Sequence, residues 1–458
     1  MKRSAEGKRG FGRLQIIEAL KNGTATVWMS GIVWGLGCLI KKQFVKGLLF
    51  FAAEVLIVYY MITKGFYNLS KLLTLGELEQ QKIWDDVNCV YTYVDGDRSL
   101  VILLYGIVTI AVLLFALTLM IKSVKCAYTL ECLKKEGKEI PTIREELASF
   151  MDRNLHITLL SFPITGILVF TVLPLVFMMC MAFTNYSIED NKLVLFDWVG
   201  LENFKRLVNL GGSLGQTFWS VLVWTLVWAF IATFSNYFLG MLLSLFINWK
   251  EIRLKKFWRF CFVLTVAVPH FVTLLIIRQM LQPEGAVNIL LRNLELIGLK
   301  ESLPFFTDIG WSRATVIIIN MWVGIPYALL QITGILQNIP QDLYDAAKVD
   351  GANPFVTFRK ITLPYMLFVT TPYLITTFMG NVNNFNVIFL TSRGLPREVG
   401  MTAGKTDLLI TWLYKLTIEN QYFDIGAVIG IMTFITLGII SLLTFHYSGS
   451  NRNEEEFR

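Results

Sequence analysis

The chain has 458 residues and a formal net charge of +7, and 54% of its residues are hydrophobic while only 16% are charged. Soluble domains carry about 25% charged residues. This composition, with a mean hydropathy of +0.56, therefore excludes an ordinary soluble protein and indicates a membrane protein. The positive charge does not require a nucleic-acid partner, because its distribution along the chain explains it better.

The first residues form a basic segment, with six Lys or Arg against two acids in residues 1–23. The apolar stretch that follows, 24–40, is short, contains three glycines and is followed at once by Lys41 and Lys42. Basic residues prefer the cytoplasmic side of a membrane. If 24–40 crossed the membrane, these lysines would lie outside. We therefore predict that it is an interfacial or re-entrant segment.

Eight later stretches approach the ~20 apolar residues that cross a bilayer. They predict an all-α polytopic membrane protein with about eight transmembrane helices: 47–63, 99–121, 156–183, 217–247, 257–282, 313–337, 365–391 and 422–447. Four parts follow from this pattern. They are an N-terminal part with two spans, a charged and helical cytoplasmic connector, a six-helix core and a cytoplasmic tail, over residues 1–121, 122–154, 155–447 and 448–458.

The basic residues give the orientation. With the N-terminus inside, the inner segments hold 26 Lys and Arg and the outer loops hold 13. This bias agrees with the positive-inside rule. It predicts a multi-pass protein of the cell membrane with both termini in the cytoplasm.

Residues 338–364 form the one strongly punctuated polar segment between two apolar runs. Pro340 begins a short helix, and Gly351 suits the left-handed position just after a helix ends. Asn353 then caps a second helix with Pro354 at its first position, and Leu363-Pro364 is expected to end it. A helical hairpin of this kind between spans is typical of a docking element.

Catalytic and metal-binding motifs are not found. GMTAGKT at 400–406 has the wrong spacing for a phosphate-binding loop. That loop needs four residues between its first glycine and the Gly-Lys pair, and here only three separate Gly400 from Gly404-Lys405. The six cysteines and three histidines show no metal-ligand spacing. We expect a non-enzymatic chain with no metal and no cofactor of its own.

Two spans carry polar stripes at helical spacing, Asn320, Val323, Gly324 and Tyr327 in one and Thr377, Gly380, Asn381 and Asn384 in the other. Small and amide residues at this spacing can simply pack helices together. They also suit a neutral, hydroxyl-rich ligand, because amides offer both donors and acceptors. No charged residue lies on either stripe, which disfavours ions, phosphates and amino acids.

The polar hairpin resembles the EAA loop of the permease subunits of bacterial ABC importers. Matching positions include Asp345, Ala346, Ala347, Asp350 and Gly351, followed by Ile361, Leu363 and Pro364. The first position is Asp where the family has Glu, which puts an ion pair of that residue in question. The resemblance implies that the hairpin docks on an ATP-hydrolysing subunit and transmits its motion.

Segments NMWVGIPY, TFMGNVNNFNVIFL and AGKTDLLITWLYK are similar to the MalF-type subunit of maltose and maltodextrin importers. That resemblance covers about 156–447 and implies a type I importer core in which the eight stripe residues contact the sugar. Thr377 stands where the family has serine. Gly380 replaces an aromatic residue, which would widen the site. The loop at 184–216 is short, as in Gram-positive carbohydrate importers.

The resemblance implies several partners: a second permease, two ATP-binding subunits that bind ATP and Mg²⁺, an extracellular sugar-binding protein, membrane lipid and an oligosaccharide. Transport would proceed by alternating access. A galactoside or raffinose-type sugar remains an alternative substrate. A secondary transporter is a different class, but only Glu54 is an acid well inside a predicted span.

Overall fold

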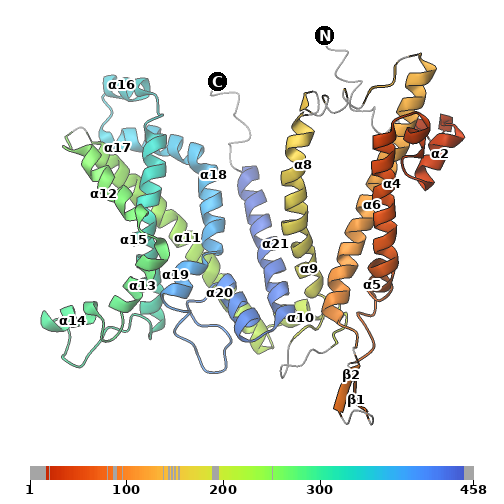
Figure 1. Ribbon diagram of the computed structural model, residues 1–458. Helices are drawn as coiled ribbons and strands as arrows, with labels where there is room; N and C mark the ends of the chain where they lie inside the picture. The colour runs from red at the N-terminus through yellow and green to blue at the C-terminus, as the bar shows by residue number, and fades with distance from the viewer. Residues whose placement is uncertain are drawn as a thin grey trace. The chain divides into compact units, whose positions relative to one another are not determined.

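The structure is a computed structural model that describes residues 17–447, except 20, 80, 86–89, 95, 138, 143–144, 146–147, 149–150, 153–154, 188–194 and 250. The predicted tail at 448–458 and residues 1–16 of the basic segment lie outside the described residues. The chain folds into two compact units, Met1–Gly200 and Leu201–Arg458 (Figure 1). Packing thus divides the chain after Gly200, whereas the pattern of spans suggested a division in the connector.

The secondary structure assigned in the described part of unit 1 consists of helices and one small β-hairpin. Its elements are α2 (Ala25–Ile32), α3 (Leu36–Ile40), α4 (Phe44–Tyr60), η1 (Met61–Gly65), α5 (Phe66–Ser70), β1 (Gln81–Asp85), β2 (Val90–Val94), α6 (Ser99–Lys135), α8 (Leu155–Ile167), η2 (Leu168–Val172) and α9 (Leu173–Met181). The strands pair antiparallel, with Gln81 opposite Val94. Helix α6 extends the predicted second span into the charged connector.

The segment predicted to be interfacial or re-entrant forms two short helices, α2 and α3, that pack against α6. At 1.5 Å per residue neither is long enough to cross a bilayer. Side chains satisfy the irregular backbone between them: the Gly35 N–H donates to Ser123 Oγ at 2.8 Å, and the Trp34 N–H donates to Glu54 Oε2 at 2.7 Å. Glu54, the acid inside a predicted span, therefore has a structural role.

An ion pair joins the C-terminal end of α5 to the N-terminal end of α6. Lys71 Nζ lies 2.6 Å from Asp97 Oδ2, and the Asp97 carboxylate also accepts from the backbone N–H groups of Glu77 and Leu78. The Asp97 side chain is only 3% exposed, against 26% for Lys71. The Lys71 ammonium is the main reason that the pKa of Asp97 lies well below its usual range.

Unit 2 holds the remaining spans and the polar hairpin. Its elements are α10 (Glu202–Val208), α11 (Ser213–Asn248), α12 (Lys255–Ala267), α13 (His270–Met280), α14 (Ala286–Asn293), α15 (Ile309–Leu336), α16 (Gln341–Val349), α17 (Pro354–Thr357), η3 (Phe358–Thr362), α18 (Leu363–Val382), α19 (Phe385–Leu390), α20 (Leu409–Tyr414), η4 (Lys415–Glu419) and α21 (Phe423–Tyr447).

Helix α11 organises this unit by packing against both α15 and α18. A Cβ on Gly240 of α11 would lie 2.7 Å from the Cβ of Ala328 on α15, so the two backbones approach closely only because both residues are small. Trp228 and Tyr237 fill the rest of this contact and are almost fully buried. The helices that carry the two predicted stripes are thus both fixed to one scaffold helix.

Within the described residues, seven helices are long and apolar enough to cross a membrane, and a bent pair raises the number to eight. The prediction of an all-α polytopic protein is confirmed. The span predicted at 257–282 is not one straight helix, because α12 and α13 meet at 86°. Pro269 lacks an N–H and disfavours a helical residue before it. Figure 1 places α12 at the hairpin end of unit 2 and α14 at the opposite end, so the broken pair traverses the unit.

The polar hairpin continues directly into the next span. We predicted that Leu363-Pro364 ends the second hairpin helix, and this is wrong, because α17, η3 and α18 form one run within Pro354–Leu390. In the π-helical turn η3 the Leu363 N–H donates to the Phe358 carbonyl. The changed register accommodates Pro364 at the start of α18. A second proline, Pro372, lies inside α18, and the run turns between the α17 and α18 labels in Figure 1.

Candidate functional site

The two predicted polar stripes meet at three asparagines. Asn384 Nδ2 lies 3.5 Å from both Asn320 Oδ1 and Asn381 Oδ1. Asn381 Nδ2 donates to Thr233 Oγ1 of α11 at 2.9 Å, and the indole N–H of Trp228 donates to the Asn381 carbonyl at 3.1 Å. We call Asn320, Asn381 and Asn384 the amide cluster. It joins α15, α18 and the start of α19 across the scaffold helix.

The amide cluster is not fully satisfied. Asn320 is 5% exposed, and its Nδ2 has no hydrogen-bond partner among the described residues. An unpaired buried donor costs about 1–3 kcal/mol. The two bonds that Asn384 Nδ2 donates are 3.5 Å long, which is longer than ordinary N–H···O hydrogen bonds. The cluster therefore holds donor capacity that a ligand with hydroxyl groups would satisfy.

The two stripe glycines have different surroundings. A Cβ on Gly324 would lie 2.2 Å from Nδ2 of Asn236, so this glycine is a contact between α15 and α11. A Cβ on Gly380 would meet nothing within 4 Å. Gly380 therefore leaves open space, whereas Gly324 serves packing. Thr377 lies one turn before Gly380 and is partly buried.

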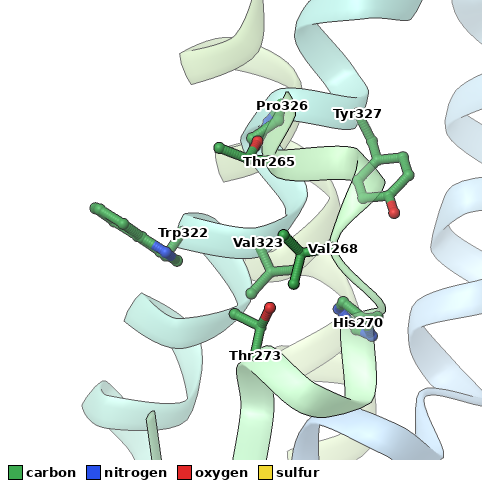
Figure 2. Close-up of a pocket in the computed structure, with 8 residues that line it drawn as sticks. All are labelled: Thr265, Val268, His270, Thr273, Trp322, Val323, Pro326 and Tyr327. Carbon is green, nitrogen blue, oxygen red and sulfur yellow. The ribbon is translucent and has the colours of Figure 1, made fainter. Parts of the chain in front are cut away.

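Tyr327 and Val323 lie away from the amide cluster, in a hollow of about 170 Å³ beside the break between α12 and α13 (Figure 2). The hollow is lined by Thr265, Val268, His270, Thr273, Trp322, Val323, Pro326 and Tyr327. The sequence stripes did not include His270 or Thr273. The signal for them was Pro269, which breaks the helix just before His270.

The polar hairpin has the punctuation that the sequence indicates. Gly351 has φ +71°, and Asn353 Oδ1 accepts from the Val356 N–H at 2.8 Å. Ala347 is buried, whereas Ala346 and Asp350 are exposed. Asp345 pairs with Lys348 at 2.6 Å, with both side chains more than half exposed. The hairpin thus presents an open surface that includes Leu343, Val349 and Phe355 at 42%, 88% and 68% exposure.

The opposite end of unit 2 is closed by a buried ion pair that sequence reasoning missed. Lys415 Nζ donates to Asp407 Oδ2 at 2.6 Å and to the Arg393 carbonyl at 2.9 Å. The Asp407 carboxylate also accepts from the Gly404 N–H and the Thr411 hydroxyl. Gly404 thus belongs to a sealed loop, and GMTAGKT forms no phosphate cradle. The signal available in sequence was two opposite charges in an otherwise apolar stretch.

Comparisons with known proteins agree with this geometry. The model of the binding-protein-dependent transport system inner membrane component family matches residues 236–449. The galactooligosaccharide permease GanP of Bacillus subtilis is 34% identical over 92% of this chain and 97% of its own. The maltodextrin permease MdxF of the same organism is 35% identical over 93% and 95%.

A crystal structure of a bacterial alginate ABC transporter, in complex with a pentasaccharide-bound periplasmic protein, matches with a TM-score of 0.53 and 22% identity, over 67% of this chain and 97% of the other. At that identity the match shows the fold alone. The membrane-crossing helices and the family match define a membrane transport protein.

The chain belongs to the binding-protein-dependent transport system inner membrane component family. It is a multi-pass, non-catalytic permease subunit in the cell membrane, and the importer to which it contributes works with a substrate-binding protein. The predicted family and the permease function are confirmed.

Proposed function

We propose that this chain is a transmembrane subunit of an ATP-driven importer that moves oligosaccharides of the maltodextrin type inward by alternating access. The unpaired Nδ2 of Asn320 within the amide cluster carries the proposal. It marks a buried site that is short of acceptors, and none of the eight stripe residues carries a charge, as a neutral sugar requires. MdxF and GanP, which are permeases for maltodextrins and galactooligosaccharides, support an oligosaccharide.

The substrate site is built on both stripes. Asn320, Asn381 and Asn384 would bond the sugar hydroxyls, and Gly380 would leave room for a sugar ring. Tyr327, which lies further along α15, would stack on the C–H face of the oligosaccharide. Val323 and Thr377 would border the same path. Gly324 would act indirectly, because its contact with Asn236 sets the distance between α15 and α11.

The second candidate substrate is a galactoside or raffinose-type sugar, which the similarity to the galactooligosaccharide permease GanP favours. Competition separates the two. Unlabelled galactooligosaccharide should compete poorly with labelled maltodextrin for uptake if the maltodextrin assignment is right. A secondary transporter is a weaker alternative, since Glu54 is engaged by the Trp34 N–H. It would purify alone and transport without ATP.

The partners would be a second permease, two ATP-binding subunits that bind ATP and Mg²⁺, and an extracellular sugar-binding protein. The chain itself would bind no cofactor. Its hairpin, with Asp345, Ala346 and Asp350 on its exposed side, would dock on one ATP-binding subunit. Both termini would lie in the cytoplasm. External cysteine labelling should then reach residues 392–421 but not 338–364, and labelling of the hairpin would overturn this orientation.

The test of the sugar site uses Asn381→Leu and Asn320→Leu. Each removes a group that bonds the sugar, so uptake per assembled complex should fall roughly tenfold, the equivalent of 1.4 kcal/mol. Asn383→Leu is the matched control, because Asn383 is exposed and its side chain bonds only the Met379 carbonyl. Poor assembly with normal uptake per complex would show that the cluster only packs helices.

A second test addresses the room at Gly380. Gly380→Phe should reduce uptake of bulky oligosaccharides before small ones. Gly166→Phe on α8 is the control, because a Cβ there also meets nothing within 4 Å. An unchanged range of substrates in Gly380→Phe would show that Gly380 does not face the sugar.

A further inference from the structure

The break between α12 and α13 leaves three polar side chains facing the same hollow. The hydroxyls of Tyr327 and Thr273 and the imidazole of His270 line it. None of the three side chains has a hydrogen-bond partner among the described residues. In Figure 2 the Tyr327 hydroxyl points toward the side on which His270 lies, and the Thr273 hydroxyl points inward. The hollow therefore offers several unsatisfied polar groups in one place.

The backbone adds donors at the same point. His270 is the first residue of α13, and the first N–H groups of a helix have no intrahelical partner. Pro269, the preceding residue, has no N–H of its own. Such broken helices often lie beside substrate sites in transporters, because their free backbone groups face a polar ligand.

The hollow and the amide cluster lie along one face of α15. Val323 lines the hollow and lies one turn from Asn320, and Tyr327 lies one turn further on. The seven residue steps from Asn320 to Tyr327 span about 10 Å along the helix axis. A ligand that contacts both ends of this face must be longer than a single sugar ring.

We propose that this hollow is a second sugar subsite, which takes a further ring of the oligosaccharide whose first ring is held by the amide cluster. This inference rests on the proposed function. His270 and Thr273 bond the hydroxyls of the second ring, and the ring of Tyr327 borders its apolar face. The lining contains no carboxylate, Lys or Arg, so the subsite suits an uncharged ring.

The subsite predicts a dependence on chain length. Short substrates that occupy only the amide cluster do not reach His270 or Thr273, whereas longer substrates contact both. Loss of one such contact should lower uptake of a tetrasaccharide roughly tenfold relative to that of a disaccharide with the same linkage. A residue that acted only on packing would change both substrates equally.

The experiment measures uptake by the full complex, with its binding protein, in proteoliposomes. His270→Ala and Thr273→Val should each lower tetrasaccharide uptake selectively, and His270→Gln should restore part of it. Thr265→Val is the matched control. Thr265 lines the same hollow, but its hydroxyl already donates to the Phe262 carbonyl at 2.7 Å, so the substitution should have no selective effect.

The outcomes separate the subsite from the proposed function. If wild type takes up neither sugar, the proposed function fails. If wild type transports and Asn381→Leu does not, but His270→Ala and Thr273→Val match Thr265→Val at every length, the subsite alone is overturned. Loss of assembly in both His270→Ala and Thr273→Val would also overturn it, since the residues would then be structural.

Discussion

The two ends of unit 2 use the same kind of ion pair in opposite ways. At one end Lys415 and Asp407 are 10% and 0% exposed, and backbone groups and hydroxyls complete their bonding. At the hairpin end Lys348 and Asp345 are 58% and 57% exposed. The distances, 2.6 Å in both pairs, do not distinguish them. Burial therefore separates a pair that closes the fold from one on a surface open to a partner.

The largest effect should come from breaking the buried pair. Lys415→Met leaves the Asp407 carboxylate buried without its cation, which costs about 3–5 kcal/mol. We expect a sharp loss of assembled complex, measured by yield and melting temperature in detergent. Asp407→Asn with Lys415→Met should recover part of the loss, because both charges are then gone. Equal instability in the double variant would show that the charges are not the cause.

The half-buried pair of unit 1 should have an intermediate effect that depends on pH. Asp97→Asn loses charge-assisted bonds to Lys71 and the backbone, worth about 2 kcal/mol. The folded-state pKa of Asp97 is depressed. Its stabilisation is therefore complete above the unfolded value of about 3.9 and is lost as the pH falls toward the folded value. The melting-temperature difference between wild type and Asp97→Asn should hold at neutral pH and shrink below about pH 4. A difference already lost at pH 6 would contradict this.

A smaller structural effect with a large functional one is expected at the hairpin turn. Gly351 has φ +71° with open space around its Cβ, so Gly351→Val should add about 1–2 kcal/mol of strain. Sugar-stimulated ATP hydrolysis by the assembled complex should fall. Gly400→Val is the matched control at the opposite end, with φ +84° and equally open surroundings. Equal loss of coupling in both would argue against a docking role for the hairpin.

The smallest effect should be on the exposed pair. Lys348→Gln removes a surface ion pair worth about 0.5 kcal/mol or less. The melting temperature of the separated permease should therefore barely change. If Asp345 meets a cation on the ATP-binding subunit, Lys348→Gln should even favour docking, whereas Asp345→Asn should weaken it. Equal binding by both variants in a pull-down would place Asp345 outside the interface.

Sequence predicted the features that depend on local chemistry. Gly351 and Asn353 mark the hairpin because turn and cap preferences act over a few residues. The polar stripes were also visible, since helical spacing is local. Gly324 and Gly380 could not be told apart, because only the tertiary fold brings Asn236 against one of them. Asp407 and Lys415 were overlooked because they lie eight positions apart, one just before α20 and the other just after it, and only the folded chain brings them together.

The broken span was missed for a different reason. Hydropathy averages over a window, so 257–282 read as one apolar helix although Pro269 was visible within it. The helix end predicted at Pro364 is the opposite error, because there a break was expected and the helical run continues. A proline there does not end the helix, because the π-helical turn before it shifts the register. Both cases show that a proline predicts a local change but not its form.

The helical run from the hairpin to the amide cluster is bent, so it has one arm toward the hairpin and one arm toward α19 (Figure 1). No loop separates Pro354 from Val382. If the bend lies at Pro372, the arm before it is about 27 Å long and the arm after it is about 16 Å long. If both arms rotate together as a rigid body, a displacement of about 5 Å at the hairpin gives a displacement of about 3 Å at Asn381. That displacement is comparable to a hydrogen-bond length, so it is enough to make or break the contacts of Asn384. Spin labels at the two arm ends should then report displacements in that ratio.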